Sequence, residues 1–180
     1  MRRRANLHHL YENFLAHTKH SNLMAAKYFE VFSERLALYP LGEWTELRLM
    51  EMLKVDMVEC AVVALFGKQI LKMNPEFVDI YWELDEVIGE LAFGLPRAVN
   101  PRPYKSRDKF HAMMGKYVES AWDHYDWDAP GAEDADWDEH FGARLNREMA
   151  KWLKVNFCMQ TNAGSFATLV LGYVNCKQPV

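Results

Sequence analysis

Several patterns are scarce or missing in this 180-residue chain, and each absence excludes a class of protein. Cysteine occurs only at Cys60, Cys158 and Cys176, an odd number without a Cys-x-x-Cys pair. Neither a disulfide framework nor a zinc site is therefore predicted, and this usage fits a reducing compartment. No stretch reaches the roughly 18 apolar residues that a membrane-spanning helix needs, so no span is expected in this chain.

An excess of positive charge is also lacking. The formal net charge is -4 and the pI is near 6.0, so no nucleic-acid partner is expected. The short basic run from Arg2 to Arg4 is interpreted as a solvated chain end. The chain has no glycine-rich phosphate loop and no Gly-x-Ser-x-Gly motif, so nucleotide-dependent enzymes and hydrolases of that type have no local support.

Apolar and aromatic residues are abundant. They make up 50% of the chain, with six Trp, eight Tyr, ten Phe and ten Met. A single domain over residues 1–180 can therefore bury a sizeable core. Flexible methionines and aromatic rings also suit an adaptable apolar cavity, and the composition does not separate a cavity from an ordinary core.

Apolar residues recur at helical spacing, and no alternating strand pattern competes, so the sequence predicts an all-α fold. Turn and capping residues mark the expected helix ends. Four helices are expected over residues 3–16, 45–66, 136–153 and 161–176; Gly67 ends the second, and a capping box of Asp136 and Glu139 opens the third. Three more are expected from their end signals. One is capped by Ser21 and closed by Pro40 and Gly42, one runs from Asn74-Pro75-Glu76 to Gly94, and one is capped by Ser106.

Three groups of residues suggest chemistry, and each has a simpler interpretation. His8, His9, His17 and His20 could hold a metal, but solvated helix histidines are the favoured reading. The acidic loop 126–136 resembles the start of a calcium loop. Counted from Asp126, however, Pro130 stands at the fifth position and Trp137 at the twelfth, where oxygen ligands are needed. No metal-binding residue is therefore predicted.

Cys60 or Cys158 could act as a thiol nucleophile. Neither has a nearby histidine in the sequence or a cationic pattern that would activate it, although Lys154 lies one turn before Cys158. Ordinary buried or half-buried cysteine is the favoured interpretation, and no catalytic residue is predicted.

The segment LAFGLPRAVNPRPYKSRDKFHAMM, from Leu91 to Met114, is similar to the connection between two distal helices in filamentous-fungal cytochromes P-450. The neighbouring segments LFGKQILKMNPEFVDIYWELDEVI and DADWDEHFGARLNREMAKWL resemble the flanking helices of that family in the same order. The resemblance implies a partial P-450 domain over residues 1–180 that lacks the membrane anchor and the haem-binding half. It also implies a monooxygenase-related protein of fungal secondary metabolism, inactive alone, that acts on a lipophilic small molecule.

The resemblance implies haem and a cytochrome P-450 reductase for a complete family member, at the endoplasmic-reticulum membrane. Without an anchor, a cytoplasmic location is expected for this chain. Residues 162–179 resemble the start of the long helix over the haem, where Lys177 stands at the place of the usual oxygen-activating Thr. Under this mapping Phe166, Val170 and Val174 lie four residues apart and are expected to face the substrate, with plain core as the alternative.

The family's haem loop, Phe-x-x-Gly-x-x-x-Cys-x-Gly, is not matched here. Around Cys176 the Phe position is Leu169 and the final Gly position is Gln178, so no cofactor-binding residue is predicted and no thiolate haem complex is expected. A second hypothesis is a non-enzymatic helical protein that binds an apolar ligand or a partner helix. A third is a metal-dependent helical enzyme that uses the histidines.

Overall fold

The structure, a computed structural model, describes residues 9–40, 42, 44 and 46–156. Most of these residues are helical and only four lie in strands, in agreement with the all-α fold that the sequence predicts. The elements in chain order are the π-helix η1 (Glu12–Ala16), α2 (Thr18–Leu36), α3 (Leu49–Glu51), the π-helix η2 (Met52–Asp56), α4 (Met57–Phe66), α5 (Gln69–Met73), α6 (Phe77–Ala92), α7 (Pro101–His124), strands β1 (Trp137–Asp138) and β2 (Gly142–Ala143), and α8 (Arg144–Asn156). Within the described part, no helix combines the length and the apolar character that crossing a membrane requires.

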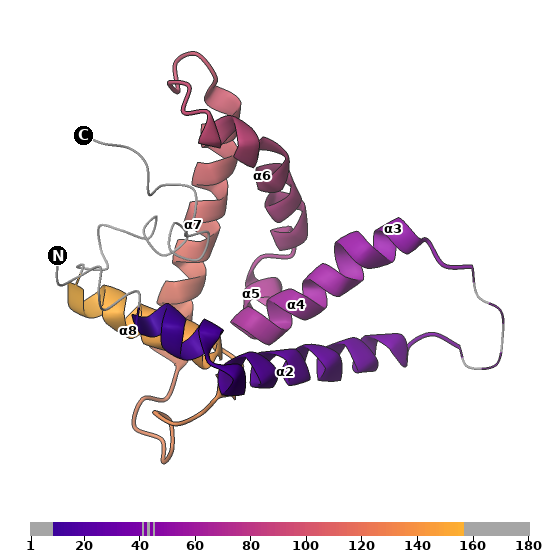
Figure 1. The fold of residues 1–180 in the computed structure, drawn as a ribbon, viewed down its shortest axis with the longest axis vertical. Coiled ribbons are helices and arrows are strands. Elements are labelled where there is room, and N and C mark those ends of the chain that lie inside the picture. Colours follow the sequence, from indigo (N-terminus) through magenta and orange to yellow (C-terminus); the bar gives the residue numbers. More distant parts are fainter. Residues whose placement is uncertain (1–8, 41, 43, 45, 157–180) are drawn as a thin grey trace.

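The helices pack in pairs that meet at a common base. Helix α2 packs against α4, and α6 packs against α7. Figure 1 shows the two pairs diverging from the region of α5, with α8 lying across the foot of α7. The short strands β1 and β2 pair antiparallel beside the end of α4. This base is therefore where most elements of the described chain come together.

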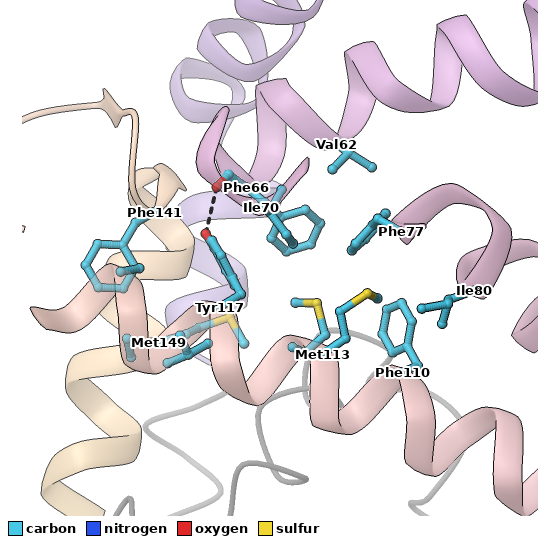
Figure 2. Close-up of a cluster of buried hydrophobic side chains, with 14 of the residues drawn as sticks. Val62, Phe66, Ile70, Phe77, Ile80, Phe110, Met113, Tyr117, Phe141 and Met149 are labelled. Atoms are coloured by element: carbon cyan, nitrogen blue, oxygen red, sulfur yellow. Dashed lines mark hydrogen bonds between the residues drawn. The ribbon is translucent and has the colours of Figure 1, made fainter. Parts of the chain in front are cut away.

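The core lies between α6, α7, the end of α4 and α8. Phe77, Ile80, Leu84 and Val87 follow helical spacing on α6 and are all buried, so one face of α6 is apolar and the other is charged. Figure 2 shows Phe77 and Ile80 beside Phe110 of the predicted α7 stripe. The stripe residues buried on α7 are Phe110, Met113, Met114, Tyr117, Val118 and Ala121.

Two predicted helix starts are wrong, because the serines lie inside helices. Helix α2 begins at Thr18, and Ser21 Oγ donates instead to the carbonyls of Leu15 and His17. Helix α7 begins at Pro101, where the missing N–H of proline is tolerated. Ser106 is fully buried one turn later and donates to the Glu83 carboxylate at 2.8 Å, so it connects α7 to α6.

Asn74 does not cap the helix that follows it. Its Nδ2 donates to Ile70 O at 3.2 Å, and therefore it closes the end of α5. The backbone carbonyl of Asn74 still accepts from Phe77 N at 3.0 Å, so Pro75 forms a tight turn between the two helices. The predicted helix itself is confirmed, from Phe77 to Ala92.

The predicted helix over residues 45–66 is only partly confirmed. Helix begins at Leu49, and regular α-helix without a π-turn begins at Met57. The C-terminal half buries Cys60 and Ala64 as expected. The N-terminal apolar residues predicted to face inward, Leu47, Met50 and Leu53, are exposed. The sequence pattern is the same along both halves, so periodicity alone could not tell which half is covered.

The capping box predicted at Asp136 and Glu139 is wrong. Residues 137–143 form a tight hairpin, and the helix begins only at Arg144. Asp138 Oδ1 accepts from the backbone N–H groups of His140 and Phe141, at 2.8 and 2.7 Å, and this double acceptance fixes the turn. The acidic connection before it is a loop of turns, as predicted.

Candidate functional site

The end of α4 is held by side chains from three other elements. Trp137 Nε1 donates to Ala64 O at 3.0 Å, and Tyr117 Oη donates to Phe66 O at 2.7 Å. Asn146 Nδ2 donates to Leu65 O, which lies between those two acceptors in the sequence. The last carbonyls of a helix have no partner within the helix, and here the hairpin, α7 and α8 supply the missing donors. Figure 2 shows Tyr117 reaching Phe66 from α7.

Two glycines allow the hairpin to approach α4 this closely. Gly67 has φ +82° and Gly142 has φ +68°, a region that favours glycine. A Cβ on Gly67 would collide with the backbone carbonyl of Glu139, and one on Gly142 would collide with the backbone of residues 65–67. The sequence correctly predicts a glycine end for α4, but it gives no sign that Gly142 is the second half of the contact.

Arg147 on α8 is fully buried and connects the acidic loop to the helices. Its Nη2 donates to the carbonyls of Glu133 and Ala135, at 3.0 and 2.7 Å, and its Nη1 donates to Tyr125 Oη at 3.0 Å. The same Nη1 lies 3.6 Å from the Asp138 carboxylate, which balances the buried charge. Burial raises the pKa of Asp138, against the effect of the hairpin N–H donors and of Arg147.

Two open hollows flank the hairpin. One, of about 330 Å³, lies under the acidic loop and includes His124, Tyr125, Asp138 and His140 in its lining. The rings of His124 and His140 stack there at 6.1 Å. The other, of about 250 Å³, lies between α2 and β1, where Lys27 stands 4.2 Å from the centre of the Trp137 ring. Neither hollow presents a nucleophile beside a base.

Cys60 is an ordinary buried cysteine, as the sequence favours. It lies on α4 and is 2% exposed, and burial raises the pKa of its thiol. The nearby Arg35 opposes this shift, but Arg35 is already engaged with Asp56 and Glu59. A reactive thiol needs access and a lowered pKa, and Cys60 has neither. Cys158 lies outside the described residues.

The histidines do not converge on one point in the described chain. His9 lies 3.2 Å from Glu12, and His20 lies 3.8 Å from Asp136. No group of three or more His, Cys, Asp or Glu within residues 9–40, 42, 44 and 46–156 could hold a metal ion. Two exposed acidic residues of the loop lie near α8: Glu133 is 3.9 Å from Lys151 and Asp134 is 3.5 Å from Arg144.

The residues predicted to face the substrate, Phe166, Val170 and Val174, lie outside the described residues, as does Lys177. The buried polar residues Asn146 and Arg147 were not predicted from the sequence. Their spacing could have indicated burial. Asn146 stands three positions before the buried Met149, and Arg147 stands three before the buried Ala150, so both share the inward face of α8.

Large apolar side chains are exposed at the far end of the α2–α4 pair. We call this surface the apolar arm, defined by Leu36 and Leu38 at the end of α2 and by Leu49, Met50 and Leu53 on α3 and η2. Their side chains are between 40% and 75% exposed. Singly exposed apolar residues are common, whereas Leu49, Met50 and Leu53 are exposed within five consecutive positions.

Comparisons with known proteins identify relatives of this chain. It is 44% identical over 165 residues to the cytochrome P-450 monooxygenase calL of Penicillium decumbens, which covers 92% of this chain and 31% of calL. It is 27% identical over 122 residues to fsoE of Humicola fuscoatra and 24% identical over 106 residues to efuG of Hormonema carpetanum, both named as cytochrome P-450 monooxygenases. These two matches cover 67% and 58% of this chain, and 21% and 19% of the relatives.

No family model matches the chain, and no solved structure matches it. The chain thus spans less than a third of the length of the curated relatives it matches. The match to calL extends over nearly the whole chain, and the helical fold agrees with the all-α part of that family. The chain therefore belongs, as a segment, to the cytochrome P-450 family.

Proposed function

We propose that this chain forms part of a fungal cytochrome P-450 monooxygenase that oxidises a lipophilic small molecule in secondary metabolism. The observation that carries the proposal is the 44% identity to calL over 92% of the chain. Such similarity over 165 residues implies that the helices described here are built as in that relative. A P-450 reductase is the proposed electron donor, and the endoplasmic-reticulum membrane is the proposed location of the complete enzyme.

Haem is the cofactor of the family, and the described residues do not fit its thiolate ligand. The described thiol is Cys60, which is buried within α4 and has a raised pKa. The cysteine that binds the haem of a cytochrome P-450 must be a thiolate with access to the iron. In the proposed enzyme the ligand therefore comes from a part of the protein other than residues 9–40, 42, 44 and 46–156.

A chimera tests the proposal directly. In calL, the 165-residue region that matches this chain would be replaced by the corresponding residues of this chain. We expect the reduced, carbon-monoxide-bound chimera to show a thiolate-type Soret band, because the replaced helices should fold in the same way. A well-folded chimera that takes up no haem would contradict the proposal. Native calL and calL with a scrambled insert serve as the positive and negative controls.

The substrate-facing role proposed for Phe166, Val170 and Val174 is tested in the same chimera, provided that the exchanged region is extended through Lys177. Lys177→Thr restores the hydroxyl that the family resemblance implies, and so separates oxygen activation from substrate binding. Phe166→Ala should then change the ratio of products while haem content stays the same. A loss of haem content and stability without a change in products would show that Phe166 is a core residue.

The alternative of a stand-alone, non-enzymatic helical protein makes a different prediction. In that case the 180-residue chain would bind an apolar ligand or helix without any further P-450 sequence. The names of the relatives give this alternative no support. Calorimetry of the purified chain, with and without such a ligand, distinguishes the two functions.

A further inference from the structure

No further inference is drawn: the strongest candidate, the stacked pair His124 and His140 in the hollow under the acidic loop, has no third ligand that would complete a metal site within residues 9–40, 42, 44 and 46–156, and nothing in that part of the structure shows what else would occupy the hollow.

Discussion

Tyr117 shows how one side chain can join two helices that are distant in the sequence. It is completely buried on α7, and its hydroxyl donates to Phe66 O at the end of α4. Burial raises the pKa of Tyr117 well above 10, so its hydroxyl keeps its proton and remains a donor at any physiological pH. The ring also packs edge-on against the Phe66 ring, with centroids 6.0 Å apart.

Tyr117→Phe should therefore lower the free energy of unfolding by about 1–3 kcal/mol, because a buried carbonyl loses its donor while the ring contact remains. Urea denaturation of the purified chain measures the change. The control is Tyr104→Phe, whose hydroxyl donates to Leu95 O at an exposed position, where water can replace it. Equal effects of the two substitutions would show that burial of the Tyr117 bond is unimportant.

Glycines at positive φ offer a second comparison between matched residues. Gly67 and Gly131 have φ values of +82° and +80°, but only Gly67 is in contact with another segment. Gly131→Ala should cost about 1 kcal/mol from backbone strain alone. Gly67→Ala should cost roughly 2 kcal/mol more, because the hairpin must move away from α4. Similar losses for both variants would contradict the close approach of the hairpin.

At the scale of the element, α7 contains a histidine that makes its stability depend on pH. Burial lowers the pKa of His111 from its ordinary value of 6.5, and the positive charge of Arg107 lowers it further. Asp108 opposes these effects in part. As the pH falls below 6.5, the unfolded chain takes up this proton before the folded chain does. The stability contributed by neutral His111 is therefore lost toward acid pH.

His111→Gln should flatten this dependence. Between about pH 7.5 and pH 5.5, the free energy of unfolding should fall more for the natural chain than for the variant. Arg107→Gln should have an intermediate effect, because it removes one of the two causes and leaves burial in place. Denaturation curves at both pH values give the comparison. Parallel losses of stability in all three proteins would contradict a role for His111.

Helices were predictable from the sequence where one of their faces packs against another helix of this chain. The α6 and α7 stripes follow helical spacing, and the structure confirms both. Helix starts were less predictable, since Ser21 and Ser106 have the chemistry of caps but lie inside helices. The apolar arm was misjudged because periodicity shows which side of a helix is apolar and not whether anything covers it. The 137–143 hairpin was missed because two-residue strands have no alternation to detect.

At the scale of the whole molecule, family membership and the all-α fold were predictable, whereas the polar contacts at the base were not. Donors such as Asn146 and Trp137 act on carbonyls of α4 that only the tertiary structure brings near. The candidate substrate stripe at Phe166, Val170 and Val174 remains a prediction from the family resemblance. Its position depends on segments outside the described residues.

We expect the purified 180-residue chain to form no thiolate complex with haem. Cys60 is a buried residue of α4, and the sequence around Cys176 does not match the family's haem loop. The reduced, carbon-monoxide-bound absorption spectrum is the measurement. A stable thiolate-type Soret band that Cys176→Ser abolishes would overturn the mapping onto the family, and Cys60→Ser serves as the matched control.

The three donors at the end of α4 also affect the order in which the protein is made and folded. Tyr117, Trp137 and Asn146 follow their acceptors by 51, 73 and 81 residues. During synthesis, α4 therefore leaves the ribosome long before these donors exist, and water must satisfy its last carbonyls until Asn146 has followed. Contacts of such long sequence separation form late. The amide protons of that last turn should then exchange with solvent only when α7, the hairpin and α8 open together.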